Sequence, residues 1–412
     1  MSAWRRSLAA AGVSLVLASC TGAPSTKQPS GSTETRIGLL VPLSGPRAAA
    51  GREALQGAQL AGELVNDAVA VPLPLASSAG LPGLGGASVK IVPADSGGEP
   101  ERGATQAARL ATTQGVAGLV SAGDTQVTAA ASERTERIGV PFVDAGASAD
   151  FLTERGMDWF FRTAPTDRIL GEQLLSMLQR TAGGSTARRL AIVHSRDVAG
   201  TDMSSALEGL AGEGGYDVVA KVSVTAASGS GSVAADQLRA AGPDAVIAAT
   251  AQPADSNALL NGFKALGWRP PVTMAMGAGF TPQAVLPAIA DDADVLRSGS
   301  WSAELAGRNP VAAQVAGLYK RRFDKSMTET AAKAFTATLT LAQAIDAAGS
   351  RDAGRVRAAL MALDVPGRAT IMPWDGIQFD EAGQNARAGA VVERLARDGV
   401  HVVFPPEVAA RT

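Results

Sequence analysis

The chain has 412 residues, of which 46% are hydrophobic and 18% are charged, and its formal net charge is −2 at pH 7. Lys and Arg are scattered without a basic stripe, so nucleic acid is excluded as an expected partner. Cys20 is the single cysteine, so the body that follows it holds no internal disulfide. The length favours two lobes over one compact domain.

The first 35 residues predict an exported protein with a flexible tether. Arg5 and Arg6 precede an apolar stretch too short to span a membrane, and residues 17–20 read Leu-Ala-Ser-Cys. This motif resembles the lipobox of bacterial lipoproteins, in which the cysteine is lipidated and becomes the new N-terminus. We therefore expect a signal peptide at 1–19, a lipid on Cys20 and a Ser-, Thr-, Gly- and Pro-rich tether at 20–35. An ordinary secretory signal with an incidental cysteine is the alternative.

The next part of the chain alternates between strand and helix patterns. Residues 37–46 (IGLLVPLSGP) predict a buried parallel strand that ends in a turn, and a helix follows from Gly51. After a Pro-, Gly- and Ser-rich insertion at 68–88, three more strands are expected at 89–95, 115–123 and 140–146, separated by helices at 100–114 and 125–139. This α/β alternation predicts a doubly wound parallel sheet.

The pattern restarts after residues 160–165 (FFRTAP). Strands at 189–195, 216–224, 244–250 and 271–277 alternate with helices, which predicts a second lobe of the same kind. From Phe280 onward come helical segments and then short strands, which have to cover both lobes by crossing between them. We expect lobe 1 to hold residues 36–163 and 278–367, and lobe 2 to hold 164–277 and 368–412.

The order of these segments resembles the extracytoplasmic solute-binding receptors of ABC importers, of the branched-chain amino-acid type with the type I periplasmic-binding fold. The resemblance rests on IGLLVPLSGP, GVAGLVSAG, IGVPFVDAGAS, FFRTAPTDRILGEQL, PDAVIAAT, GFKALGW and WDGIQFDEAGQN. It implies two doubly wound lobes joined by three crossings, with a small-molecule ligand in the cleft between them. It also implies a permease that recognises the closed conformation of the receptor. It further implies a monomer without a cofactor, which the lipid on Cys20 holds at the extracytoplasmic side of the cell membrane, on the cell surface or the periplasmic face.

The resemblance also implies where a ligand carboxylate binds, namely at the loops after the third and fourth strands. The candidates there are Thr125, Gln126, Thr128, Ala147 and Ser148. Helix capping by Asp124 or Thr125, and by Ser148, is the alternative role for these loops. Ser44 in the first turn is a further candidate, for which a purely structural turn is the alternative.

In the second lobe the resemblance places an acid where Asp255 stands, facing a ligand ammonium; capping of the following helix is the alternative. The family's aromatic walls are missing, because Ala50 and Ala199 stand at those positions. Branched-chain amino acids are therefore only one option among amino acids, amides and related carboxylates. Three aromatic residues are candidate replacement walls, with packing near the hinge as the alternative: Trp301, Trp374 and Phe280.

Two functions follow from these patterns, and catalysis is a third alternative. The first is a lipid-anchored receptor that delivers a solute to an importer, and the second is a sensor or scaffold on the same fold. Catalysis is not expected, because His194 and Ser195 are neighbours on a strand and point to opposite faces. The sequence also has no GxSxG elbow. With only His194 and His401 present, no metal site is expected.

Overall fold

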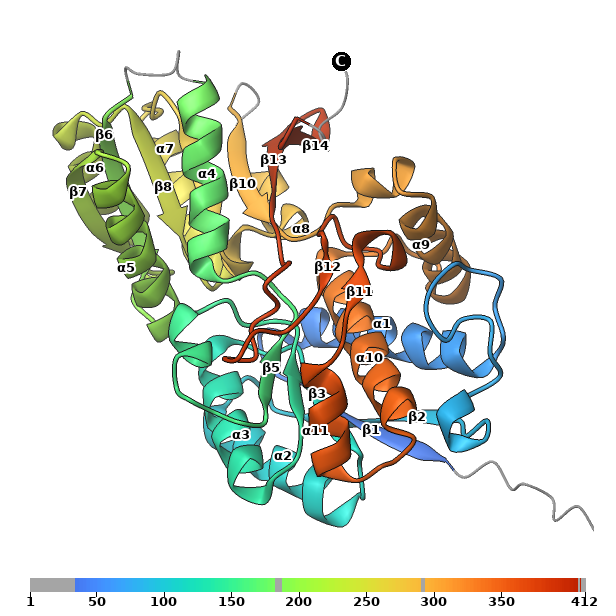
Figure 1. Cartoon of the computed structure of the whole chain (residues 1–412). Coiled ribbons are helices and arrows are strands. Elements are labelled where there is room, and N and C mark those ends of the chain that lie inside the picture. The colour runs from blue at the N-terminus through green and yellow to red at the C-terminus, as the bar shows by residue number, and fades with distance from the viewer. Residues whose placement is uncertain (1–33, 182–186, 290–292, 407, 409–412) are drawn as a thin grey trace, which may run out of the picture. The chain divides into compact units, whose positions relative to one another are not determined.

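The computed structural model describes residues 34–181, 187–289, 293–406 and 408 (Figure 1). The predicted signal peptide, Cys20 and all but the end of the predicted tether lie outside the described residues. The described residues form one compact unit. No helix in the described ranges is long and apolar enough to cross a membrane.

Lobe 1 is built on a five-stranded sheet with the order β2-β1-β3-β4-β5, in which every neighbouring pair is parallel. The strands are β1 (Thr35–Val41), β2 (Val89–Asp95), β3 (Gly118–Ser121), β4 (Phe142–Asp144) and β5 (Phe160–Arg162). The helices are α1 (Ala48–Asn66), α2 (Pro100–Thr113), α3 (Thr125–Ile138), α9 (Pro310–Phe323), α10 (Glu329–Ala348) and α11 (Ala353–Met361). A short antiparallel pair, β11 (Val365–Pro366) and β12 (Gly376–Ile377), packs on the same core.

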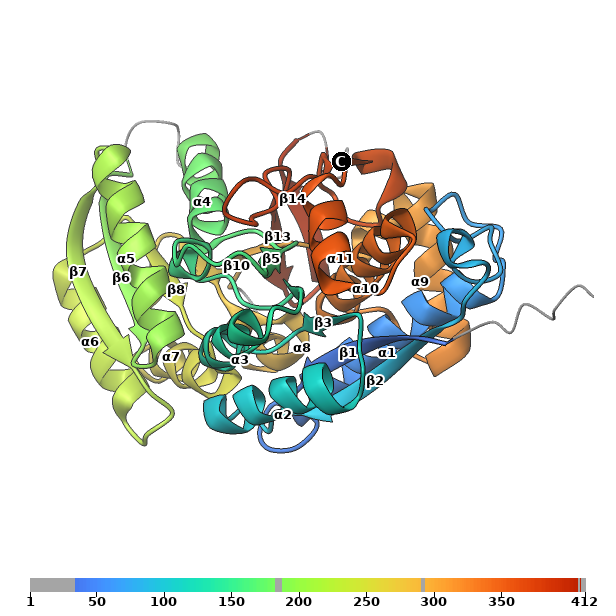
Figure 2. The ribbon, with the colours of Figure 1, turned by 60° about the horizontal axis from the view of Figure 1, so that its bottom comes forward.

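The apolar run of β1 is explained by burial on both faces of this sheet. Ile37, Leu39 and Val41 enter the core formed with α1 and α10, whereas Leu40 enters the core formed with α2 and α3. Side chains alternate between faces along a strand, so a strand covered on both sides is apolar throughout. Figure 2 shows α2 and α3 next to each other on one side of the strands and α10 on the other.

Lobe 2 is built on a seven-stranded sheet with the order β14-β13-β10-β9-β8-β6-β7. Its strands are β6 (Arg189–Ser195), β7 (Asp217–Val224), β8 (Ala245–Ala249), β9 (Thr273–Met276), β10 (Val295–Gly299), β13 (Val391–Ala396) and β14 (Gly399–Phe404). Its helices are α4 (Asp167–Thr181), α5 (Val198–Glu213), α6 (Ser230–Ala241), α7 (Pro253–Ala265) and the short α8 (Pro282–Val285). The strands from β10 to β7 are parallel, and β13 and β14 add an antiparallel edge.

The chain passes between the two sheets at other places than the sequence predicted. Because β10 pairs with β9, lobe 2 continues to Gly299 instead of ending at 277. The chain also goes back to lobe 2 later than the expected residue 368. Ile371, Trp374 and Phe379 still belong to the lobe 1 core, and β13 begins only at Val391. The three crossings therefore follow β5, β10 and the segment that ends near Asn385.

Each lobe carries a glycine where a helix starts against the end of a strand. A Cβ on Gly51 would lie 1.8 Å from the carbonyl oxygen of Pro42, and one on Gly200 would lie 2.4 Å from the carbonyl oxygen of Ser195. Only a glycine allows α1 and α5 to begin this close to the preceding strand. The approach brings both helix N-termini to the carboxyl ends of the two sheets.

Candidate functional site

A cavity of about 110 Å³ lies between the two lobes, at the carboxyl ends of their parallel strands. Lobe 1 lines it with the start of α1, the loops after β3 and β4, and the start of α10; lobe 2 lines it with the start of α5, the loops after β8 and β9, and the end of β10. A neighbouring cavity of about 360 Å³ shares Arg47, Arg297 and Glu329 with it and belongs to the same cleft. This is the place where open α/β sheets bind ligands.

A larger cavity, of about 1170 Å³, lies at the opposite end of the lobe 2 sheet. It is lined by the segment before β9, the start of β10 and the turn between β13 and β14, so only lobe 2 contributes to it. Because it lies at the amino ends of the parallel strands and away from the facing lobe, we do not assign the ligand site to it.

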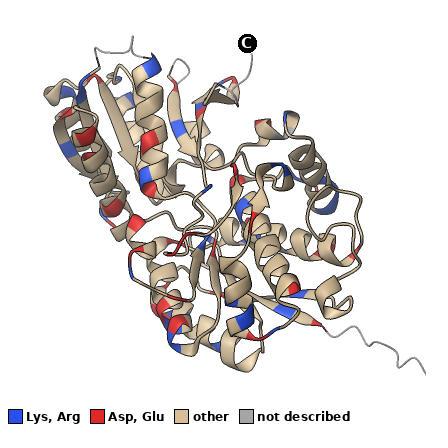
Figure 3. Cartoon of the chain, viewed as in Figure 1, with Lys and Arg blue, Asp and Glu red and all other residues tan. Residues whose placement is uncertain are grey.

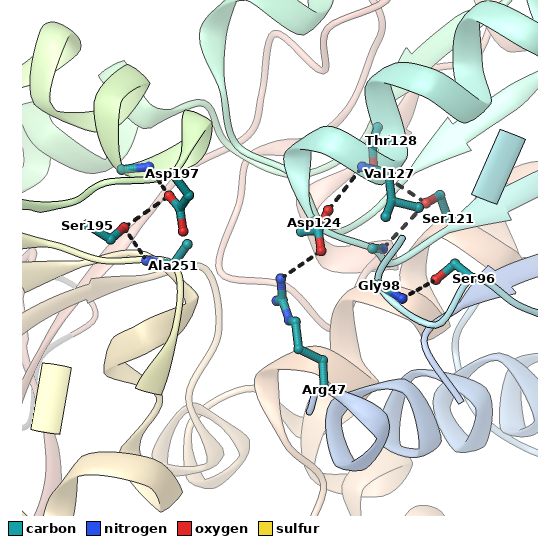
Figure 4. Close-up of polar contacts among 12 residues, drawn as sticks. Arg47, Ser96, Gly98, Ser121, Asp124, Val127, Thr128, Ser195, Asp197 and Ala251 are labelled. Atoms are coloured by element: carbon teal, nitrogen blue, oxygen red, sulfur yellow. Dashed lines mark hydrogen bonds and ion pairs between the residues drawn. The ribbon is translucent and has the colours of Figure 1, made fainter. Parts of the chain in front are cut away.

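Asp124 and Arg47 form one polar wall of the interlobe cavity. Asp124 is the N-cap of α3: its Oδ1 accepts a hydrogen bond from the Val127 amide at 3.0 Å, while Arg47 Nη1 lies 3.4 Å from its Oδ2 (Figure 4). On the other side of the cleft in Figure 4, Asp197 caps α5 and binds the Ser195 hydroxyl. Both carboxylates are thus held by their own lobe.

A buried ion network forms the floor of the cavity. Arg297 of β10 donates to Glu329 of α10, and its Nη1 donates to Glu393 of β13 at 2.6 Å. The amide and hydroxyl of Ser300 each donate to Glu329 Oε1 at 2.7 Å. Burial opposes ionisation of Glu329, but the charges of Arg297 and Lys333 together with these hydrogen bonds lower its pKa to about 2. The network joins lobe 1, through α10, to lobe 2.

The loop after β4 is held in place by Asp144, which lies behind the cavity wall. Its Oδ2 accepts hydrogen bonds from the amides of Gly146 and Ala147, at 3.2 and 2.9 Å, and its Oδ1 accepts one from the Thr128 hydroxyl at 3.2 Å. Burial raises the pKa of the Asp144 carboxyl to about 7, against the opposing charge of Arg162. Asp144 therefore shapes the loop that presents Ala147 and Ser148.

The structure places the eight predicted ligand residues in two groups. Four line the interlobe cavity: Thr125, Ala147, Ser148 and Ala199. The other four do not line it: Gln126, Thr128, Ser44 and Asp255. Gln126 is exposed and Thr128 is buried behind the wall; the Ser44 hydroxyl accepts a hydrogen bond from Arg102, and Asp255 accepts one from the amide of Ala226. The sequence did not indicate Arg47, Arg297, Glu329 or Lys333, although the Glu329–Lys333 spacing of four residues puts two charges on one helix face.

The two alanines at the expected aromatic positions, Ala50 and Ala199, both line the cavity. The three candidate replacements are packed in the cores, at 2% exposure for Trp301, 5% for Trp374 and 0% for Phe280. The indole nitrogen of Trp301 donates to the carbonyl of Ile371 at 3.1 Å. Packing in the cores is therefore the role that the structure gives to these rings, in lobe 1 for Trp301 and Trp374 and in lobe 2 for Phe280.

Charged side chains are interspersed over the elements of both lobes (Figure 3). Three carboxylates, those of Asp150, Asp167 and Asp202, offer oxygens within 4.8 Å of one another, where the loop after β4 meets α4 and α5. The Ser195 hydroxyl donates to Asp197 and accepts from the Ala251 amide, while His194 Nδ1 lies 2.9 Å from the Ser195 carbonyl oxygen. His194 is therefore not placed to take a proton from the Ser195 hydroxyl.

Comparison with known proteins identifies relatives along nearly the whole chain. A family model described as "Periplasmic binding protein" matches residues 34–394. A curated relative, Leu/Ile/Val-binding protein homolog 7 of Brucella abortus, is 25% identical over 391 residues, which covers 92% of this chain and 93% of that protein. These matches confirm the resemblance that the order of the sequence segments indicated.

Solved structures confirm the fold. The leucine-binding protein LivK of Thermotoga maritima superposes with a TM-score of 0.74 at 20% identity, covering 90% of this chain and 99% of that one. A solute-binding protein of an ABC transporter from Rhodopseudomonas palustris, solved with 3,4-dihydroxybenzoic acid, gives a TM-score of 0.69 at 18% identity and covers 91% of this chain and 94% of that one. The predicted two-lobed α/β architecture is thus confirmed.

Proposed function

The chain belongs to the periplasmic binding protein family, and from this premise we propose that it is an extracytoplasmic receptor that binds a small polar solute and delivers it to an ABC importer. The solute is an amino acid, an amide or a related carboxylate. Relatives named as Leu/Ile/Val-binding proteins and a structural neighbour solved with a benzoic acid derivative support this class of ligand. A membrane permease is the partner, and the receptor acts as a monomer.

One observation carries this proposal: the interlobe cavity is lined by the first turns of α1, α3, α5 and α10, which come from both lobes. Helix N-termini present free amide hydrogens and a partial positive charge, which suit a carboxylate. A ligand that contacts both lobes stabilises the closed form relative to the open one. The permease then recognises the closed receptor.

A blocking substitution tests whether this cavity is the ligand site. Ala199→Trp places an indole into the cavity, and we expect it to abolish binding of amino acids, amides and carboxylates measured by calorimetry. Val198→Trp is the matched control, because Val198 is the neighbouring residue, is 45% exposed and does not line the cavity. If both variants bound ligand as the unmodified protein does, the cavity would not be the binding site.

We also propose that a lipid on Cys20 holds the receptor at the membrane. A lipid anchor with a flexible tether raises the effective concentration of the receptor near its permease. Cys20→Ser is expected to move the protein from the membrane fraction to the medium or to block processing, with ligand affinity unchanged. A variant that stayed in the membrane fraction and was processed normally would contradict lipid anchoring.

A further inference from the structure

The charged side chains that line the interlobe cavity differ in whether they already have hydrogen-bond or ion-pair partners within the protein. Two are acidic, Asp124 and Glu329, and three are basic, Arg47, Arg297 and Lys333. If all are ionised, the lining carries one more positive than negative charge. A charged group without a partner in the protein can pair with an opposite charge on the ligand, so these groups indicate which charges the ligand carries.

Both acidic side chains already use their two oxygens. Asp124 accepts from the Val127 amide through Oδ1 and pairs with Arg47 through Oδ2. Glu329 accepts from the amide and the hydroxyl of Ser300 through Oε1 and pairs with Arg297 through Oε2. A ligand ammonium would have to share one of these carboxylates with its arginine partner, or be desolvated without a counter-charge of its own.

Asp255, the acid that the sequence placed opposite a ligand ammonium, does not supply a carboxylate to the cavity either. It lies at the start of α7, accepts a hydrogen bond from the Ala226 amide and is absent from the cavity lining. Among the described residues that line the cavity, there is thus no carboxylate without a cationic partner.

Lys333 is in the opposite situation. It lies four residues after Glu329 on α10, is half-buried and lines the cavity, yet it forms no hydrogen bond or ion pair within the described part of the chain. The hydroxyl of Ser298, which is 2% exposed and also belongs to the lining, has no hydrogen-bond partner among the described residues. An ammonium that donates no hydrogen bond and a buried unpaired hydroxyl at one cavity both indicate a ligand with acceptor oxygens.

We propose that the cavity selects a carboxylate that carries no ammonium group, with Lys333 as its counter-charge. This inference rests on the proposed receptor function and narrows its ligand class. The first turns of four helices add partial positive charge around the same space, which favours an anion over a zwitterion. Because Ala50 and Ala199 line the cavity in place of aromatic side chains, there is space for the apolar part of the ligand, and these two residues do not restrict the shape of that part.

Matched pairs of ligands test this directly by calorimetry at pH 7 on the full chain: propanoate against alanine, 4-methylpentanoate against leucine, and 3-phenylpropanoate against phenylalanine. Each pair differs in one ammonium group. We expect the acid without the ammonium to bind at least about tenfold more tightly in the pair whose size fits, since one uncompensated buried charge costs more than about 1.4 kcal/mol. Tighter or equal binding of the amino acid would overturn this inference while leaving the receptor function intact. Absence of binding in all pairs would overturn both.

Lys333 variants test its assigned role with the ligand that binds most tightly. Lys333→Met keeps the apolar stem and removes the charge, and we expect about thirtyfold or greater loss of affinity. Lys333→Arg should retain most of the affinity. Lys320→Met is the control, because Lys320 is an exposed lysine on another lobe 1 helix and does not line the cavity. Unchanged affinity in Lys333→Met would overturn the assignment of Lys333.

Discussion

Asp167 is a buried carboxyl group at the first crossing between the lobes. It is the first residue of α4, is 1% exposed, and its Oδ1 has no hydrogen-bond partner among the described residues. Asp150 and Asp202 lie beside it, and the Asp150 amide donates to Asp202 Oδ2 at 3.0 Å. Burial is the main cause that raises the pKa of Asp167 to about 8; the charges of Asp150 and Asp202 also raise it, while a hydrogen bond with Ser148 and the charge of Arg162 oppose the rise. A proton on Asp167 therefore relieves the repulsion within this group.

This raised pKa makes stability depend on pH. Asp167 has an ordinary pKa near 3.8 in the unfolded chain and a pKa of about 8 in the folded one. Its favourable contribution is therefore fully present below pH 4 and is lost as pH rises towards 8. We expect Asp167→Asn to reduce the decline in the free energy of unfolding between pH 5 and 8, by up to about 1.4 kcal/mol per pH unit.

Urea unfolding at pH 5, 6, 7 and 8 measures this slope in each variant. Asp144, whose pKa burial also raises, to about 7, remains in both proteins and keeps part of the slope. Asp236→Asn is the control, since Asp236 is an exposed carboxylate on α6. A slope in Asp167→Asn equal to that of the unmodified protein would show that the carboxyl of Asp167 is not the titrating group.

At the scale of elements, helices α6 and α7 pack backbone against backbone. A Cβ on Gly231 of α6 would lie 1.8 Å from the carbonyl oxygen of Ala258, and one on Gly262 of α7 would lie 2.2 Å from the carbonyl oxygen of Gly231. Backbone atoms cannot yield as flexible side chains do, so these positions do not accept a methyl group without separation of the helices.

We therefore expect Gly231→Ala to lower the free energy of unfolding by about 2 kcal/mol or more, although alanine is the better helix former. Gly209→Ala on α5 is the matched control, because no atom lies within 4 Å of its Cβ position. It should be neutral or stabilising by up to about 1 kcal/mol. Chemical denaturation of the two variants distinguishes close packing from helix propensity, and equal stability of both would contradict the packing argument.

The elements that the sequence predicted well are those whose signals are local. The continuous apolar run of β1 and the capping residue Asp124 before α3 each need only their neighbours in the chain to be recognised. β10 was missed because its sequence, VLRSG, carries a charge inside a buried strand. Arg297 is neutralised there by Glu329 and Glu393, residues 32 and 96 positions away, and no local pattern indicates such partners.

The same distinction holds for the candidate site. Thr125, Ala147, Ser148 and Ala199 follow strand ends, and parallel strands bring such loops together. Lys333 reaches the cavity only because α10 returns from lobe 2 and packs against α1. That placement depends on the crossing after β10, which the sequence did not locate.

At the scale of the whole molecule, polar contacts tie the segments that cross between the lobes. The Arg162 amide at the end of β5 donates to the Gly383 carbonyl at 2.8 Å, and the Asn385 amide donates to the Arg162 carbonyl at 2.9 Å. The first and third crossings thus run side by side. The second crossing, after β10, is held by Arg297 and Ser300, which both bind Glu329 of α10. Glu329 therefore holds this crossing on the lobe 1 side, together with Ile371, whose carbonyl accepts from Trp301.

Removing the charge of Glu329 tests how much this tie contributes. Glu329→Gln leaves Arg297 with Glu393 as its one carboxylate partner, and loss of one partner from a buried ion network costs about 3 kcal/mol. Because the pKa of Glu329 is lowered to about 2 in the folded protein, its contribution is present above pH 4.5 and is lost as pH falls towards 2. The destabilisation should therefore be full at pH 7 and shrink between pH 4.5 and 2.

Urea unfolding at pH 7 and pH 3 measures both parts of this expectation, with Glu133→Gln as the control. Glu133 is 58% exposed and pairs with Arg137 on the same helix, so its loss should change stability by less than about 0.5 kcal/mol. A more open ligand-free form of Glu329→Gln, seen as a larger radius of gyration by small-angle scattering, is the accompanying expectation, because α10 would no longer hold the second crossing. Stability and dimensions equal to those of the control would contradict the role of Glu329, and would leave contacts such as that of Trp301 with the Ile371 carbonyl to hold the crossing.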